Sequence, residues 1–128
     1  MFDDFIGIPF QDGGRTKAGC DCWGLVRLVY SSLGVEVPDY KISCFASSEV
    51  SDAVEENRYK WHRILKPVTP CLVTLKLAMA LPGFVTHLGV YVGYGKFLHT
   101  MKKRNSAIEK ITHPFYNKRI EGFYEFRN

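Results

Sequence analysis

The spacing of apolar residues changes along this chain, from a helical period near the N-terminus to strand-like alternation from Cys71 onward. In a chain with that order, the helix packs on a sheet whose strands come later in the sequence. Short strands joined by turns pair antiparallel. We therefore predict an α+β fold with one N-terminal helix on a mostly antiparallel sheet of five to six strands. The predicted strands are 72–75, 87–92, 96–100, 107–111 and 120–126, and 77–81 either extends the first strand or forms a hairpin.

The predicted helix runs from Cys22 to about Leu33. Apolar side chains at positions 22, 25, 26, 29 and 33 recur at the spacing of a buried helical stripe. Asp21 is a good N-cap, and Gly34 followed by Pro38 ends the helix. Gly24 permits a close approach of helix and sheet. The helix therefore has a cysteine in its first turn.

The composition restricts the class of protein. At 128 residues and 46% hydrophobic content, the chain suits a single globular domain spanning 1–128 with its own core. Lys and Arg number 17 against 13 Asp and Glu, a net charge of +4 that suits an anionic cell wall as well as a nucleic acid. The basic cluster Lys102-Lys103-Arg104 has no nucleic-acid motif around it, so we expect a solvated turn and no nucleic-acid partner.

No apolar stretch reaches the length of a membrane span, and the N-terminus lacks the pattern of a signal peptide. We expect a chain without a membrane span that is cytoplasmic as synthesised. The segment 38–70 has a different character from the rest, with a helix predicted from Ser48 or Ser51 to about Tyr59. This segment is expected either to form one side of a cleft or to have a purely structural role. Its residues Trp61, Ile64 and Leu65 are expected to pack on the core.

Three residues that can form an activated thiol follow one another along the chain. Cys22 opens the helix, where unpaired N–H groups and the helix dipole stabilise an anion. His87 begins a predicted strand and has the near-neutral pKa that a thiol's base needs. His99 lies on the return strand of the hairpin, where position 99 comes back beside position 87. The order of nucleophile, base and orienting group is that of a papain-like site.

Each of these residues also has a structural interpretation. A cysteine in an apolar helix is commonly a core residue, and His62 and His113, which lack any motif, are predicted to be surface or structural. A zinc site from Cys20, Cys22, His87 and His99 is the alternative, but the Cys-x-Cys spacing is poor for zinc. We therefore expect no metal and no cofactor. All four cysteines are expected to be free thiols, with Cys44 and Cys71 in the core or in loops.

Two stretches resemble the NlpC-type cell-wall cysteine peptidases, a papain-like superfamily, and in particular the short form found with phage tail proteins. The stretch 7–25, which contains Gly-Ile-Pro-Phe and Asp-Cys-Trp-Gly-Leu, resembles the family's Gly-x-Pro-Tyr and Asp-Cys-Ser-Gly-Leu. The stretch 87–93, His-Leu-Gly-Val-Tyr-Val-Gly, resembles the family's catalytic histidine strand. The resemblance implies Cys22 as nucleophile, His87 as general base and acid, and His99 as the orienting group. It implies substrate-binding or oxyanion roles for Phe10, Asp21, Trp23 and Thr86.

The implied activity is thiol hydrolysis of peptidoglycan stem peptides, at the D-glutamyl–diamino-acid bond, by a phage or prophage tail component with other tail proteins as partners. The chain departs from the family pattern at three places. Phe10 stands where the family has Tyr, Trp23 where it has Ser, and 69–73 stands in place of the usual Pro-Gly-Asp. A catalytically weak tail-assembly module on the same fold is therefore the alternative. An acyltransferase or amidase that uses the same thiol chemistry is a third hypothesis.

Overall fold

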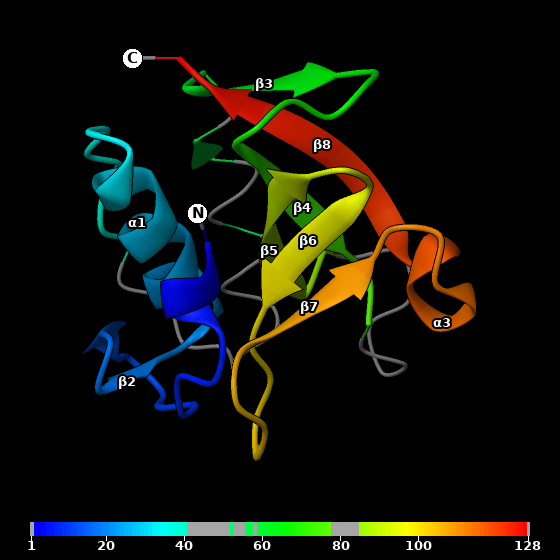
Figure 1. Ribbon diagram of the computed structural model, residues 1–128. Helices are drawn as coiled ribbons and strands as arrows, with labels where there is room; N and C mark the ends of the chain where they lie inside the picture. Colours follow the sequence, from blue (N-terminus) through cyan, green and yellow to red (C-terminus); the bar gives the residue numbers. More distant parts are fainter. Residues whose placement is uncertain (1, 41–51, 53–55, 58, 78–84, 128) are drawn as a thin grey trace.

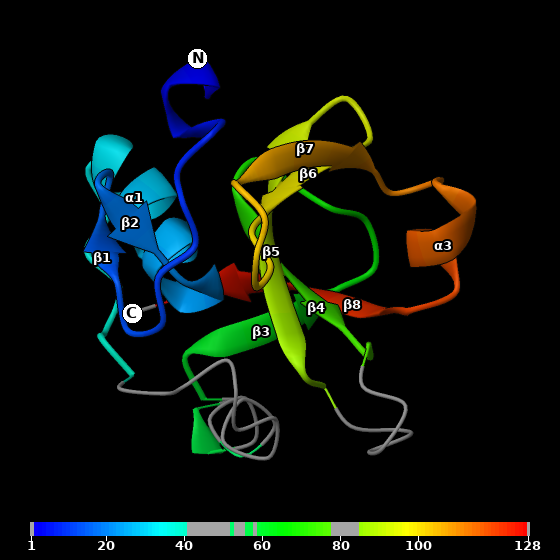
Figure 2. The same ribbon diagram turned by 90° about the horizontal axis from the view of Figure 1, so that it is seen from below.

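The computed structural model describes residues 2–40, 52, 56–57, 59–77 and 85–127. One six-stranded antiparallel sheet has helix α1 (Cys22–Ser32) on one side and the short helix α3 (Pro114–Asn117) on the other (Figures 1 and 2). The predicted α+β architecture is confirmed. The strands are β3 (Trp61–Ile64), β4 (Cys71–Leu75), β5 (His87–Gly93), β6 (Lys96–His99), β7 (Ala107–Lys110) and β8 (Ile120–Phe126).

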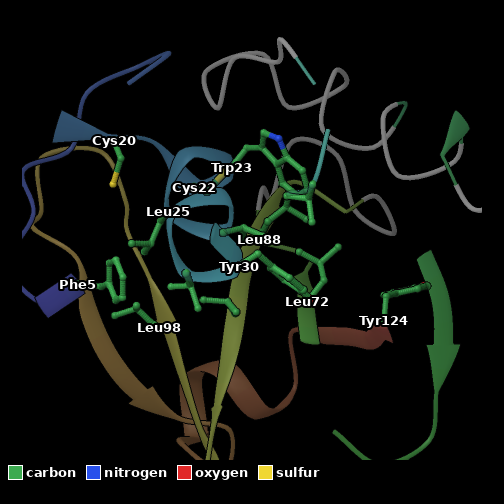
Figure 3. Packing of buried hydrophobic residues seen from close by; sticks show 14 of the residues in the cluster. Phe5, Cys20, Cys22, Trp23, Leu25, Tyr30, Leu72, Leu88, Leu98 and Tyr124 are labelled. Atoms are coloured by element: carbon green, nitrogen blue, oxygen red, sulfur yellow. The ribbon is translucent and has the colours of Figure 1, made fainter. Parts of the chain in front are cut away.

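The strands lie in the order β3-β8-β4-β5-β6-β7, so that β4 and β5 are central and β3 and β7 form the edges. Every residue of β4 is buried, because successive side chains of a strand point to opposite faces and both faces of this sheet carry a core. On the α1 side, the helix packs on alternate residues of the central strands (Figure 3), among them Leu72, Leu88, Val90 and Leu98. The α3 side buries the other set, namely Cys71, Val73, Leu75, Tyr91, Phe97 and Tyr116.

The first turn of α1 rests on a small N-terminal unit. This unit consists of the 3-10 helix η1 (Asp3–Phe5) and the two-stranded hairpin of β1 (Arg15–Thr16) and β2 (Gly19–Cys20). A Cβ atom on Gly24 would overlap the carbonyl oxygen of Gly14. The close approach that Gly24 permits is thus between the helix and the segment before β1, and the expected approach to the large sheet was wrong.

The limits of α1 agree with the sequence prediction, since the helix begins at Cys22 and has Leu33 as its C-cap. Gly34 follows in the left-handed region with a φ of 81°. The predicted burial of Leu33 was wrong, because its side chain is 37% exposed. The chain turns back at this point, where the Val35 N–H donates to the Tyr30 carbonyl oxygen, and so carries Leu33 away from the core.

Three features of the structure differ from the sequence prediction. Residues 61–64 form strand β3, which pairs with β8, where only docking on the core was expected. Trp61 is buried, but Leu65 is 97% exposed and does not dock. Helix α3 was not predicted at all. The helix expected over 48–59 and the possible strand over 77–81 fall largely outside the described residues. Among the helices that the structure describes, none is long and apolar enough for a bilayer crossing.

Candidate active site

Cys22 is held at the N-terminus of α1 by a buried cap. Asp21 is fully buried, and its carboxylate accepts from the backbone N–H of Gly24 at 2.8 Å, as an N-cap should. The same carboxylate accepts from the N–H of Gly13 at 2.9 Å and forms an ion pair with Arg15 at 2.8 Å. Asp21 therefore fastens the hairpin before the helix to the turn that carries Cys22.

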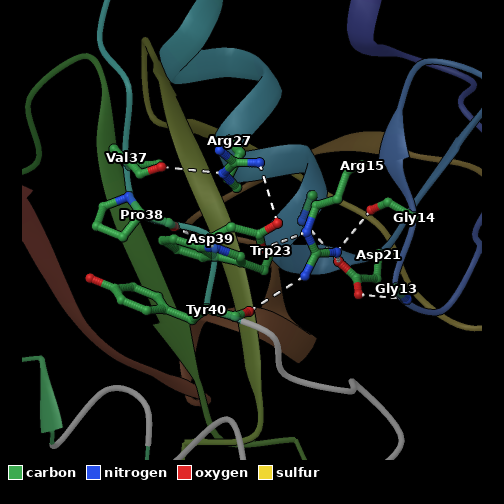
Figure 4. A network of polar contacts seen from close by, with 11 residues as sticks. Gly13, Gly14, Arg15, Asp21, Trp23, Arg27, Val37, Pro38, Asp39 and Tyr40 are labelled. Atoms are coloured by element: carbon green, nitrogen blue, oxygen red, sulfur yellow. Dashed lines mark hydrogen bonds and ion pairs between the residues drawn. The ribbon is translucent and has the colours of Figure 1, made fainter.

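The cap continues into a network of charges on the outer side of α1 (Figure 4). Arg15 also pairs with Asp39 at 2.9 Å, and Asp39 lies 3.6 Å from the guanidinium of Arg27 on α1. The indole N–H of Trp23 donates to the carbonyl oxygen of Pro38 at 3.1 Å. These contacts fix residues 38–40 against the first two turns of α1 and leave Trp23 1% exposed. Trp23 is thus part of the core in this conformation.

The two histidines meet at the end of the sheet where β5 begins and β6 ends. His87 Nε2 lies 2.9 Å from His99 Nδ1, and both side chains are buried. The register pairs Val90 with Leu98, which makes Gly89 the residue opposite His99 and His87 its diagonal neighbour. A Cβ on Gly89 would lie 3.3 Å from the Cβ of His99. The absence of a side chain at Gly89 gives the two imidazoles room to meet.

Burial decides the charge of both rings. Burial, together with the neighbouring His99, lowers the pKa of His87 to about 3. Burial also lowers the pKa of His99, although the nearby Glu109 carboxylate acts in the opposite direction. Both imidazoles are therefore neutral near pH 7, and each carries one ring proton that can lie on either nitrogen.

Two residues on the α3 side of His99 were missed by sequence reasoning. Glu109 on β7 approaches His99 Nε2 to 3.6 Å, and the Tyr116 ring packs edge-on against the His99 ring with centroids 5.1 Å apart. A signal for Glu109 existed in the sequence, because a second hairpin after β6 brings alternate residues of 107–111 beside alternate residues of 96–100. A cavity of about 410 Å³ adjoins this group and is lined by Met101, Arg104, Glu109, His113, Phe115 and Tyr116.

The other predicted site residues lie as follows. Phe10 is half-buried and bridges to Cys20 of β2. Thr86 is buried next to His87, and its hydroxyl accepts from the N–H of Leu77 at 3.1 Å. The roles of Cys22 as nucleophile and His87 as its base, and the oxyanion or substrate roles of Phe10, Asp21, Trp23 and Thr86, stay predictions.

The cysteines of the described residues, Cys20, Cys22 and Cys71, are free thiols as predicted, and Cys44 lies outside that part of the chain. Cys22 belongs to the core cluster and is 1% exposed. Within the described ranges, no group of three or more His, Cys, Asp or Glu residues is placed to hold a metal ion. His113, predicted to be surface or structural, is exposed, and its ring accepts from the N–H of Phe115 as the N-cap of α3.

Comparison with known proteins assigns the family. A sequence model of the NlpC/P60 family matches residues 7–125. The chain belongs to the NlpC/P60 family. This match includes α1 with Cys22, both histidines and the sheet that carries them. The family resemblance predicted from the two short stretches is therefore confirmed.

Among its relatives, the chain is 25% identical over 120 residues to the Murein DD-endopeptidase MepS/Murein LD-carboxypeptidase of Escherichia coli (strain K12). That match covers 93% of this chain and 56% of the relative, so the chain spans little more than half of that protein. It is 24% identical over 126 residues to a probable endopeptidase of Haemophilus influenzae, covering 97% of this chain and 68% of the relative.

Solved NlpC/P60 structures share the fold. A family protein from Bacillus cereus ATCC 10987 superposes with a TM-score of 0.68 at 22% identity, over 95% of this chain and 36% of that one. The NlpC/p60 domain of the peptidoglycan hydrolase SagA superposes with a TM-score of 0.61 at 18% identity, over 96% of this chain and 90% of that one. At these identities the likeness concerns the fold.

Proposed function

We propose that this NlpC/P60 chain is a thiol peptidase that hydrolyses peptidoglycan stem peptides, with Cys22 as nucleophile, His87 as general base and acid, and His99 as the orienting residue. The observation that carries the proposal is the contact of 2.9 Å between His87 Nε2 and His99 Nδ1, in which a second ring orients the first. Membership of the family and the named activities of the murein relative support the substrate class.

The proposed chemistry consists of two acyl transfers, first to Cys22 and then to water, and His87 relays one proton in each. His87 Nδ1 takes the proton of the Cys22 thiol, and the thiolate attacks the carbonyl carbon of the scissile amide. His87 then gives that proton to the leaving amine as the C–N bond breaks, which leaves a thioester on Cys22. Water, deprotonated by His87, attacks the thioester carbon. The C–S bond breaks, the acid leaves, and the proton on His87 returns to the Cys22 sulfur. Donors at the N-terminus of α1, such as the Cys22 amide, would stabilise the oxyanion.

We further propose that the scissile bond joins D-glutamate to a diamino acid and that the protein acts in a phage or prophage tail. The murein relative is named for two other activities, those of a DD-endopeptidase and an LD-carboxypeptidase. The bond that this chain cleaves must therefore be measured directly. The masses of the fragments released from purified muropeptides distinguish these bonds. They also distinguish hydrolysis from acyl transfer, since a transferase product contains the acceptor in place of water.

The test compares the wild type with Cys22→Ala and with the matched control Cys71→Ala, which removes a buried thiol from β4 on the other core. We expect Cys22→Ala to release no fragment, whereas Cys71→Ala retains cleavage at a temperature where it is folded. His87→Ala should be almost inactive, and His99→Ala should keep a measurable remnant. Wild-type turnover in Cys22→Ala would overturn the mechanism.

The burial of Cys22 favours one other candidate. Cys22 as a whole residue is 1% exposed, so little of its surface is open to a peptide in this conformation. A tail-assembly module that keeps the fold without useful catalysis would not need an open thiol. Absence of any fragment from the wild type, together with tight binding to a tail protein, would favour that module over the peptidase.

A further inference from the structure

The series of contacts that joins His87 to His99 continues beyond His99. The Nε2 atom of His99 faces the Glu109 carboxylate on β7 at 3.6 Å. The register pairs Glu109 with Phe97 and His99 with Ala107, so His99 and Glu109 are diagonal neighbours on one face of the hairpin. His99 is 4% exposed and the Glu109 side chain is 28% exposed. Three groups on consecutive strands thus form one line from β5 through β6 to β7.

The positions of the ring protons follow from the end of this line. An ionised carboxylate has only acceptors, and its charge favours an N–H that points at it. A neutral His99 with its proton on Nε2 has a bare Nδ1, which can only accept. The partner nitrogen at 2.9 Å, His87 Nε2, must then carry the proton of His87. That leaves His87 Nδ1 bare.

We propose that Glu109 is a positioning residue that selects the ring tautomer of His99 and, through it, of His87, so that His87 Nδ1 is free to take a proton from the Cys22 thiol. Glu109 acts two rings away from the sulfur and touches neither substrate nor nucleophile. The proposal rests on the proposed function for its catalytic consequence, while the tautomers themselves are a property of the free protein.

The groups around His99 show why a carboxylate is needed at this position. Besides His87 and Glu109, the ring contacts Phe97 and Tyr116, and the Arg104 cation near it opposes a proton on the ring. Arg104 lines the same cavity as Glu109, so without Glu109 the charge left on that side of the ring disfavours a proton on His99 Nε2. The proton then moves to His99 Nδ1, His87 Nε2 must accept, and the proton of His87 lies on Nδ1. In that state His87 cannot take the thiol proton.

The experiment reads the tautomers directly by NMR of protein labelled with ¹⁵N in the histidine rings. In the wild type we expect protonated Nε2 and bare Nδ1 for both His87 and His99. In Glu109→Ala the pattern of both rings should invert or become a mixture. Glu109→Gln, which keeps the size of the side chain and an acceptor oxygen but not the charge, should lie between the two. Glu125→Ala, which removes a carboxylate from β8, is the matched control and should leave both rings unchanged.

Kinetics on muropeptides give the second readout. Glu109→Ala should lower kcat by about 10-fold or more and leave KM unchanged, because a base in the wrong tautomer slows the chemistry without altering binding. Unchanged ring signals in both Glu109 variants, with kcat equal to that of Glu125→Ala, would overturn the inference. If the wild type cleaves nothing, the proposed function fails, and the ring signals of the Glu109 variants still decide whether Glu109 sets the tautomers.

Discussion

A neutral imidazole pair at rest is the main electrostatic property of this site. His87 is buried beside a second ring, and both effects disfavour its charged form. A bare Nδ1 on a neutral ring is what a general base requires before the thiol proton moves. In the proposed mechanism the Cys22 thiolate would stand next to the ring after the proton has moved and would stabilise the imidazolium, since an adjacent opposite charge favours the charged form.

The same burial predicts how stability depends on pH. In the unfolded chain His87 binds a proton below about pH 6.5, whereas in the folded protein its pKa is lowered to about 3. Between these values the unfolded state holds the extra proton, so the free energy of unfolding falls as the pH falls. The contribution of His87 is at most ~1.4 kcal/mol per pH unit and stops changing below the folded pKa.

Denaturant unfolding of the wild type and of His87→Gln at several pH values between about 4 and 7 measures this contribution. We expect a smaller pH slope in His87→Gln, and His62→Gln on β3 serves as the control for loss of an imidazole elsewhere. Parallel pH slopes for the wild type and His87→Gln would contradict the burial argument.

At the residue scale, the sequence identified Asp21 as a cap but not as the partner of Arg15 and Gly13. Capping is local, since it depends on the residues that follow it, and helical spacing reveals it. The contacts with Arg15 and Gly13 depend on how the preceding hairpin folds back, which no periodicity records. Glu109 was missed for a related reason, because its role exists only once β6 and β7 pair.

At the scale of elements, strands joined in hairpins were predictable, whereas strand β3 and helix α3 were not. The strands β5, β6 and β7 have alternating apolar residues and are joined by turns, so each was predicted to within one residue at most ends. Strand β3 has few apolar residues, and its partner β8 lies some sixty positions away. Helix α3 has only four residues, too few for a helical period to be recognised. These elements form because tertiary contacts stabilise them.

The hairpin of β5 and β6 predicts the effect of a single methyl group. In Gly89→Ala the new Cβ would lie 3.0 Å from the Leu98 carbonyl oxygen and 3.3 Å from the His99 Cβ, tighter than normal contacts. Relieving this crowding displaces His99 from His87. We expect a loss of about 1–3 kcal/mol in stability, as for other overpacked sites, and a loss of muropeptide cleavage in protein that is still folded.

The matched control is Gly122→Ala on β8, where the three atoms nearest to the new Cβ all belong to the guanidinium end of Arg63, at 3.2 Å. That side chain is 56% exposed and can swing away. Thermal melts and muropeptide digestion of the two variants under the same conditions separate crowding from the mere loss of a strand glycine. Equal activity of Gly89→Ala and Gly122→Ala would contradict the role assigned to Gly89.

On the scale of the whole molecule, the apolar pattern was enough for the architecture. The sequence predicted one helix on a mostly antiparallel sheet, but it did not predict the second core. Four of the five residues of β4 are apolar, the fifth is Thr74, and all five are buried because each face of the sheet carries a core. The order of the strands, in which β8 inserts between β3 and β4, was not predictable, because it requires pairing between residues far apart in sequence.

Under the proposed function, the net charge of the whole chain predicts how the protein would bind an intact wall. With 17 Lys and Arg against 13 Asp and Glu, the chain carries +4, and Lys66 and Lys103 are both exposed. Attraction between a cationic protein and an anionic polymer acts over the Debye length, about 10 Å at 0.1 M salt and about 3 Å at 1 M. Binding to intact peptidoglycan should therefore weaken several-fold as salt rises, whereas cleavage of a short soluble stem peptide should change little.

Charge-reversal variants distinguish the effect of the overall charge on wall binding from the effect of a local basic patch. Lys103→Glu and Lys66→Glu each change the balance to 16 against 14 and lower the net charge to +2, but only Lys103 belongs to the basic turn beside the cavity at Arg104. If the total charge governs wall binding, cosedimentation with purified peptidoglycan at low salt should weaken equally for both variants. Weakening in Lys103→Glu alone would show that the wall contacts the turn at 101–104, and that the overall field contributes little.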